Sequence, residues 1–167
     1  MTVSRLIARP LLAAGILYGA QNALRNTDML TTKAARVTDR VVPAVQQAGI
    51  PLPSDTASLV RLNAGVQIGA ALALATGRAP RLSAAVIAAS LVPTTVAGHA
   101  FWAESEPAAK KAQTLQFVKN LSLIGGFLIA AGDTDGKPGV AWRARRAAKD
   151  ARREAKLLKR TAQAKLG

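Results

Sequence analysis

The sequence predicts an all-α protein that crosses a membrane as a bundle of four helices, and three observations lead to this fold class. Residues 82–103 contain no Asp, Glu, Lys or Arg, and about 20 apolar residues suffice to cross the ~30 Å hydrocarbon core of a bilayer. Three further uncharged runs, at residues 10–24, 62–77 and 120–132, resemble this one, and half of the whole chain is hydrophobic. The predicted spans cover about residues 6–26, 58–77, 82–102 and 113–132.

Hydropathy alone also fits a soluble, alanine-rich helical bundle, but the spacing of the glycines favours the membrane bundle. Glycine weakens a soluble helix by about 1 kcal/mol relative to alanine, whereas in a membrane it lets two helix backbones approach closely. Two GxxxG patterns and one pair of adjacent glycines lie within the uncharged runs. The glycines expected to pack helices together are Gly15, Gly19, Gly65, Gly69, Gly125 and Gly126.

The distribution of Lys and Arg predicts the orientation of the four spans. The side that holds both termini and the turn at Arg78 and Arg81 carries 15 Lys and Arg, against 8 on the other side. Because basic residues favour the cytoplasmic side, both termini are predicted to be cytoplasmic. The basic start and short apolar run of residues 1–24 also fit a signal peptide, but its removal would leave the basic C-terminal segment outside the cell.

Two segments outside the spans have helical patterns of their own. Between the first two spans, apolar residues recur at helical intervals from Leu30 to Ala48, opposite basic residues. This pattern predicts an amphipathic helix along the extracytoplasmic interface, ended or kinked by Pro43. After the membrane domain of residues 1–139, residues 140–167 predict a basic cytoplasmic tail helix.

The basic tail is expected to contact anionic lipid headgroups or an acidic protein partner. Nucleic acid is an unlikely partner, because Trp142 alone is available there for base stacking. The tail residues expected to make these contacts are Arg143, Arg145, Arg146, Arg152, Arg153, Lys156, Lys159 and Arg160.

Polar side chains gather at one end of the predicted bundle, the extracytoplasmic end. Burying a polar group at membrane depth costs free energy unless the group pairs or lines a cavity. We therefore expect these side chains either to line a pocket or to form hydrogen bonds that join the helices. His99, the sole histidine, is in the same way either a helix cap or a donor to a quinone carbonyl. The candidate pocket residues are Asn63, Gln67, His99, Trp102, Gln113, Gln116, Lys119 and Asn120.

Composition excludes several kinds of chemistry for this chain. The sequence has no cysteine and one histidine, which rules out disulfides, Fe–S ligation and a bis-histidine haem. It contains no Ser–His–Asp arrangement and no phosphate-binding glycine loop. We therefore expect no metal, no catalytic residues and no resident cofactor, with a quinone or a lipid as the conceivable ligand.

Several stretches of this sequence resemble the DoxX family of small four-helix bacterial membrane proteins. The resemblance covers roughly residues 5–140, and its most specific elements are Gly98-His-Ala-Phe-Trp102 and Gln116-Phe-Val-Lys-Asn120. The other matching stretches are residues 61–67, 77–81 and 93–97, Gly125-Gly126 and residues 133–138.

The resemblance implies a location and a role. Members of the family lie in the bacterial inner membrane; relatives are linked to a thiosulfate:quinone oxidoreductase, and others are thought to hold oxidative-stress enzymes at the membrane. It implies an accessory or scaffold subunit, together with other subunits, in a redox or oxidative-stress assembly. The alternative is a quinone- or lipid-binding subunit of a membrane oxidoreductase.

The resemblance also concerns individual positions. Gln67 replaces an acidic residue that some members carry, which argues against proton transfer. The family's recurring polar positions match His99, Trp102, Gln113, Lys119 and Asn120.

Overall fold

The computed structural model of the chain describes residues 3–134, 136 and 138–164, apart from the side chains at 140, 141 and 158–164. Every element in this part of the chain is helical, and the chain divides after Gly132 into two compact units. The elements are α1 (Val3–Arg25), α2 (Thr27–Gln47), α3 (Thr56–Ala75), α4 (Pro80–Gly98), the short 3₁₀ helix η1 (Phe101–Ala103), α5 (Pro107–Gly132) and α6 (Val140–Ala164).

Four helices of the first unit are long and apolar enough to cross a membrane, which confirms the prediction of an all-α protein with four candidate spans. They are α1, α3, α5 and the stretch Pro80–Ala103, which joins α4 to η1. Their lengths run from 20 to 26 residues, and a helix needs about 20 residues to cross the hydrocarbon core. The chain is therefore a multi-pass membrane protein.

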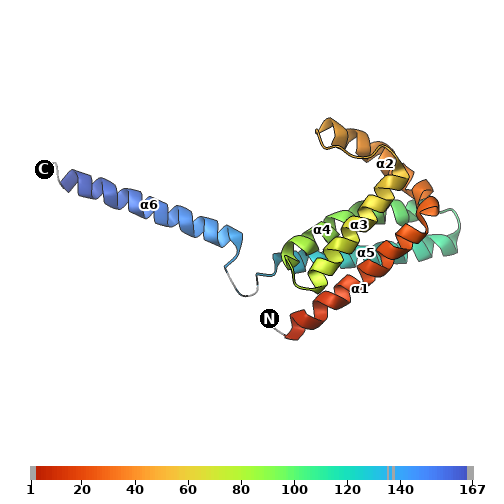
Figure 1. Cartoon of the computed structure of the whole chain (residues 1–167), viewed down its shortest axis with the longest axis horizontal. Coiled ribbons are helices and arrows are strands. Elements are labelled where there is room, and N and C mark those ends of the chain that lie inside the picture. The colour runs from red at the N-terminus through yellow and green to blue at the C-terminus, as the bar shows by residue number, and fades with distance from the viewer. Residues whose placement is uncertain (1–2, 135, 137, 165–167) are drawn as a thin grey trace. The chain divides into compact units, whose positions relative to one another are not determined.

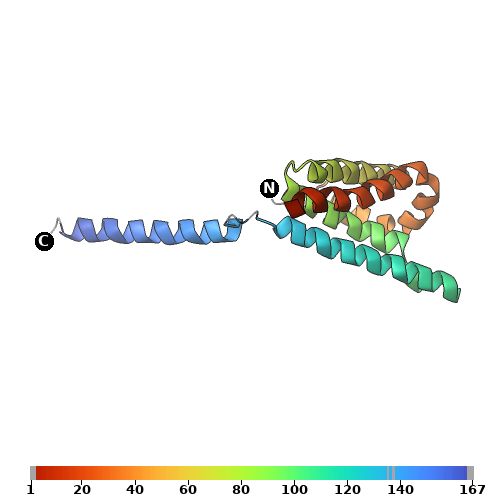
Figure 2. The same ribbon diagram turned by 90° about the horizontal axis from the view of Figure 1, so that it is seen from below.

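The four spanning helices lie side by side, and successive spans run in opposite directions (Figures 1 and 2). α3 packs against both α1 and α4, and α4 packs against α5. Among the described residues, no Cα atom of α1 lies within 8 Å of a Cα atom of α5. The bundle is consequently closed along three of its helix pairs and open between α1 and α5.

The core of the bundle consists of a few small and large apolar side chains. Phe127, Leu74 and Ile87 are the largest fully buried residues, and alanines such as Ala71 and Ala84 fill the space between the helices. Most large apolar side chains point outward instead. A soluble protein rarely exposes so large an apolar surface to water, whereas in a membrane the lipid tails cover it. The outward residues on the spans include Leu11, Leu62, Leu72, Leu128 and Ile129.

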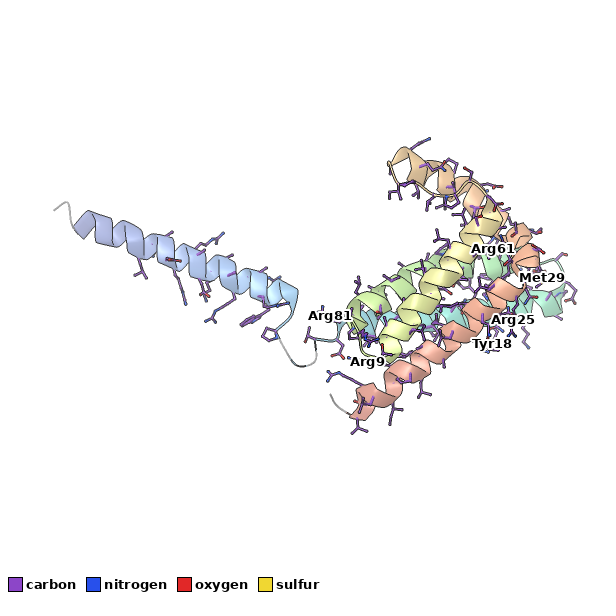
Figure 3. The ribbon with its side chains drawn as sticks, viewed as in Figure 1. Arg9, Tyr18, Arg25, Met29, Arg61 and Arg81 are labelled. Atoms are coloured by element: carbon purple, nitrogen blue, oxygen red, sulfur yellow. The ribbon has the colours of Figure 1, made fainter. Side chains whose placement is uncertain are left out.

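Arginines lie at both ends of the bundle, as expected of helices that end at the two membrane surfaces. Arg9 and Arg81 lie at one end, and Arg25 and Arg61 lie at the other (Figure 3). The Nε atom of Arg81 also donates a 2.9 Å hydrogen bond to the carbonyl of Ala131. This bond satisfies one of the carbonyls that the C-terminus of α5 leaves free.

α2 is the helix predicted between the first two spans, and it packs against α3 and α4 at the end of the bundle away from the N-terminus (Figure 1). Of the apolar positions in the pattern, Leu30, Ala34 and Val37 are half-buried, whereas Val41, Ala44 and Ala48 are exposed. The helix continues through Pro43 to Gln47, so of the two expected effects of Pro43, an end or a kink, the end is wrong. A proline costs one backbone hydrogen bond, and the packing of α2 against two helices outweighs that loss.

Two helix starts depend on acidic side chains in the preceding loops. Asp55 accepts a 2.8 Å hydrogen bond from the amide of Ser58 and caps α3. Hydrogen bonds from the side chain and backbone of Ser58 lower the pKa of Asp55. Glu106 accepts a 2.7 Å hydrogen bond from the amide of Ala109, so α5 begins at Pro107 rather than near Gln113, because this cap and a proline in the first turn both favour an early start.

Candidate functional site

Asn63 and Gln67, which share one face of α3, meet a threonine of α4. The Asn63 amide donates a 3.1 Å hydrogen bond to the hydroxyl of Thr94, and the Gln67 amide donates one of 3.4 Å to the same oxygen. The Thr94 hydroxyl in turn donates to the carbonyl of Ser90 at 2.8 Å. Gln67 is 5% exposed. The two amides therefore join α3 to α4 through one shared acceptor.

Replacing Thr94 by valine is expected to lower the free energy of unfolding by about 1 kcal/mol, because interhelical hydrogen bonds in membranes contribute about 0.6 kcal/mol each. The variant keeps the shape of the side chain but leaves the amides of Asn63 and Gln67 without their acceptor. SDS-induced unfolding in mixed micelles measures the loss, and Thr94→Ser, which keeps the hydroxyl, serves as the control. If Thr94→Val were as stable as the parent, the shared acceptor would have no structural role.

His99 and Gln113 form a second pair, which joins the end of α4 to the start of α5. The Nδ1 atom of His99 lies 2.9 Å from the Oε1 atom of Gln113. Beside them along the chain, three aromatic rings of η1 and α5 pack edge to face, with centroids 5.1 to 5.9 Å apart. These rings belong to Phe101, Trp102 and Phe117. His99 thus bonds a neighbouring helix, and Trp102 is 55% exposed at the same connection.

The remaining polar candidates all lie on α5. Gln116 and Lys119 are exposed, and Asn120 is half-buried. Lys119 is the one predicted pocket residue that lines the groove between α1 and α5. The structure therefore distributes the eight candidates over an amide cluster, a His99–Gln113 pair with its aromatic neighbours, and the outer side of α5.

Thr94 is a site residue that the sequence analysis missed. It lies in an uncharged run, where threonine stands out little from the apolar residues around it. Threonines in membrane helices commonly bond across to other helices, and Thr94 lies in the stretch that resembles a known family. That combination is the signal that would have identified it.

The glycines of the two GxxxG patterns have no close neighbour within the described chain. A Cβ atom built on Gly15, Gly19, Gly65 or Gly69 meets nothing within 4 Å. Gly125 is equally open, and a Cβ on Gly126 would lie 4.0 Å from the Cδ2 atom of Leu12. Inside the bundle, alanines occupy the closest contacts instead. The helix-packing role predicted for the glycines stays a prediction.

The second unit contains α6, a helix with one basic side and one alanine side. Ala144, Ala148, Ala151 and Ala155 follow each other at helical spacing, and the basic residues occupy the rest of the circumference. The side chains of Lys159 and Arg160 lie outside the described part of the chain. The tail residues predicted to make contacts and described here are all exposed: Arg143, Arg145, Arg146, Arg152, Arg153 and Lys156.

Contacts within α6 leave most of its charge available. Asp150 lies 3.2 Å from the Nε atom of Arg146 and 4.0 Å from the Nη1 atom of Arg153. The guanidinium of Arg146 also lies 5.9 Å from the ring centre of Trp142. Such exposed pairs contribute little to stability, so their chief effect is to hold a few of the arginines along the helix.

Within the described residues, every buried side-chain nitrogen or oxygen has a hydrogen-bond partner. In the same part of the chain, no three His, Cys, Asp or Glu side chains are close enough to hold a metal ion. Most of these bonds join a hydroxyl to a backbone carbonyl of its own helix, and a few, such as those of Asn63, Gln67 and His99, join two helices.

A comparison with known protein families finds a match that includes part of the candidate site. The model of the DoxX family matches residues 4–100, which is more than half of the chain and covers α1 from residue 4, α3 and α4 with Asn63, Gln67, Thr94 and His99. No curated protein and no solved structure matches the chain.

Proposed function

Because the chain belongs to the DoxX family of membrane proteins, we propose that it is a scaffold subunit of a membrane-associated redox or oxidative-stress assembly. In this proposal the bundle anchors the protein in the bacterial inner membrane with both termini in the cytoplasm. The basic helix α6 then holds a cytosolic partner at the membrane surface. The redox character of the assembly rests on the family resemblance of the sequence.

The single observation that carries the proposal is the contrast between the two units. In the bundle, the polar candidates Asn63, Gln67, His99 and Gln113 are bonded across helix pairs. In α6, nine Lys and Arg accompany two acidic residues between Val140 and Ala164, and the described basic side chains are exposed. These four polar side chains thus hold the helices of the bundle together, whereas α6 presents its charge to other molecules.

The charge of α6 also defines the partner. A concentration of positive charge attracts an acidic protein surface over about a Debye length, which is ~8 Å at physiological ionic strength. The alanine side of the helix offers a second, nearly flat surface against which an apolar strip of the partner can pack. We therefore expect an acidic cytosolic protein, bound in a salt-sensitive manner.

The experiment compares the full-length protein with a variant that lacks residues 140–167, each purified in a mild detergent from the native membrane. Partner proteins identified by mass spectrometry should be lost from the truncated protein. They should remain with His99→Ala, which breaks the His99–Gln113 pair but leaves α6 intact. They should also dissociate from the full-length protein at about 1 M salt, where the Debye length is ~3 Å.

A charge variant separates the role of α6 from effects of truncation. Changing Arg145, Arg146, Arg152 and Arg153 to glutamine keeps a helix-forming sequence and removes four cations. Loss of the same partners from this variant supports the proposal. Retention of those partners by the truncated protein, or their loss from His99→Ala, would contradict it.

A further inference from the structure

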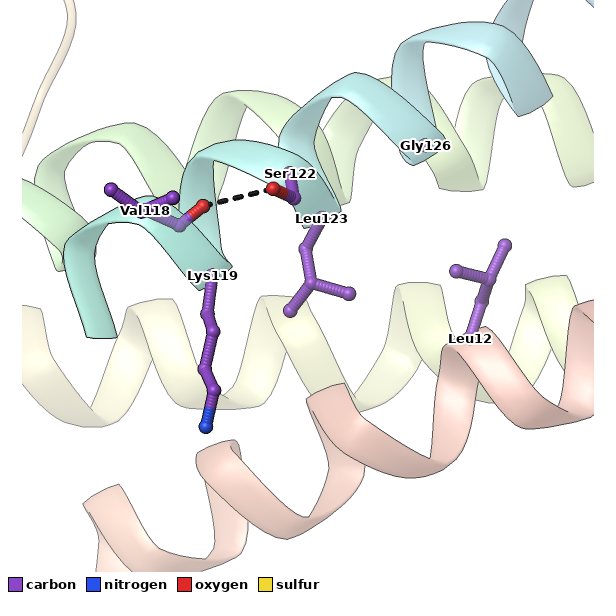
Figure 4. Close-up of a pocket in the computed structure, with 6 residues that line it drawn as sticks. All are labelled: Leu12, Val118, Lys119, Ser122, Leu123 and Gly126. Carbon is purple, nitrogen blue, oxygen red and sulfur yellow. Dashed lines mark hydrogen bonds between the residues drawn. The ribbon is translucent and has the colours of Figure 1, made fainter. Parts of the chain in front are cut away.

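A groove runs along the bundle between α1 and α5, where the two helices do not touch through their backbones. Leu12 forms its α1 wall, and its volume is about 450 Å³, which lies within the range of small-molecule sites. Figure 4 shows Lys119 extending from α5 toward α1, across the gap. The α5 wall consists of Val118, Lys119, Ser122, Leu123 and Gly126.

The groove is charged at one end and apolar at the other. Lys119 lies six residues after Gln113, the residue paired with His99, so it is toward the His99 end of the bundle. Gly126 follows seven residues later, about 10 Å along the helix, and faces Leu12 there. The hydroxyl of Ser122 is engaged with the carbonyl of Val118 at 3.0 Å. The groove therefore has one cation at its His99 end and an apolar floor below.

The ammonium group of Lys119 forms no ion pair or hydrogen bond with the described residues. Lys119 follows the charged residue Lys111 by eight positions, about 12 Å along α5. A lysine side chain can extend along the helix toward the lipid headgroups, but it does not span the whole of that distance. An unpaired charge in a spanning segment is costly, so an anion at this place would stabilise it.

The α1 side of the groove has room for more than the side chains present. Gly15 and Gly19 follow Leu12 by three and seven residues, so all three lie on the same side of α1. Nothing lies within 4 Å of a Cβ atom built on either glycine. This side of α1 therefore has no close neighbour beyond Leu12, toward the His99 end.

We propose that this groove binds one anionic phospholipid from the leaflet at the His99 end. Its phosphate pairs with Lys119, and one acyl chain follows the apolar wall toward Leu12 and Gly126. The order of the two parts matches the lipid, because the cation lies nearer the membrane surface and the apolar floor lies deeper. This inference is independent of the scaffold role of α6, since it involves the first unit alone.

The chemistry of the groove favours a phospholipid over other occupants. A single cation selects a negatively charged head, and the leucine and valine walls select an aliphatic chain rather than a second polar group. The groove is open rather than enclosed, so a lipid can enter it from the side. A transmembrane helix would bring no anion to Lys119 unless it carried an acidic residue at that depth.

The test measures phospholipid binding to the full-length protein after the removal of native lipid. Native mass spectrometry follows the first bound molecule during titration with phosphatidylglycerol, and a parallel titration uses phosphatidylcholine. We expect phosphatidylglycerol to bind more tightly. Lys119→Met should weaken its binding about fivefold, the factor expected for one membrane-proximal cation, and Lys119→Arg should stay within about twofold of the parent.

Two further variants separate specific binding from general attraction. Lys110→Met removes a cation from the same helix, but Lys110 precedes Lys119 by nine residues and lies on the opposite side of α5; it should leave the affinity unchanged. Gly126→Leu keeps the cation and fills the floor of the groove, and it should also weaken phosphatidylglycerol binding. Equal losses in Lys110→Met and Lys119→Met, equal affinities for the two lipids, or a neutral quinone as the molecule first bound would each overturn the proposal.

Discussion

Replacing Phe127 by alanine is expected to lower the free energy of unfolding by about 3–5 kcal/mol, the range for removal of a buried phenylalanine side chain. Phe127 is fully buried and is the one residue of α5 in the buried class. It packs in a core that includes Leu74 of α3 and Ile87 of α4. Its loss leaves a cavity where α5 meets the rest of the bundle, so α5 should separate before the other helices.

A position two residues further along the same helix gives the control. Ile129 is 78% exposed, and Ile129→Ala should change stability by less than about 0.5 kcal/mol, as for other surface substitutions. SDS titration in mixed micelles, followed by far-ultraviolet circular dichroism, measures both variants. If the two substitutions had equal effects, Phe127 would not be the residue that fixes α5 to the bundle.

The spanning helices could be predicted because their signal is local. An uncharged run of about 20 residues has to satisfy its backbone groups within itself in a membrane, and a helix does so. The start of α5 was placed too late because Lys110 and Lys111 interrupt the apolar run, although Glu106 and Pro107 form a start signal of their own. A helix cap depends on a few residues at the boundary, and these residues do not show in the uncharged run from which the span was predicted.

For the candidate site, the sequence predicts which side chains share a helix face but not which residues of other helices they contact. The spacing of Asn63 and Gln67 shows that they share a face, because residues four apart lie on the same side of a helix. Their acceptor on Thr94 depends on how α3 and α4 are aligned, which no pattern within one helix determines. His99 and Gln113 likewise meet because a short connection turns the chain between them. The sequence therefore predicted the end of the bundle at which polar groups gather, and the structure shows which of them pair.

The small residues at the helix contacts could likewise not be identified from their spacing alone. GxxxG is visible in a sequence because its glycines are regularly spaced, whereas a buried alanine looks like any other alanine of the chain. In the structure, Ala71 and Ala84 are fully buried, and Gly65 and Gly69 face open space. Burial depends on the neighbours of a helix as well as on its own composition, so alanines became the contact residues at the helix pairs formed within this chain.

Replacing Ala71 by leucine is expected to destabilise the bundle by about 1–3 kcal/mol, the usual effect of forcing extra methylene groups into a filled core. Ala71 is fully buried on α3, the helix that packs against both α1 and α4. A larger side chain there has to push one of these helices away. The loss should appear as a lower SDS concentration at the midpoint of unfolding.

Gly69→Leu on the same helix is the matched control, because the same side chain is added two residues away. A Cβ atom at Gly69 meets nothing within 4 Å, so the leucine should extend into the surroundings and change the midpoint little. Equal destabilisation by the two variants in monomeric protein would mean that the side of α3 that carries Gly69 is packed as closely as the side that carries Ala71, contrary to the structure. A difference in the expected direction would show that buried alanines, rather than the conspicuous glycines, determine how closely the helices of this bundle approach.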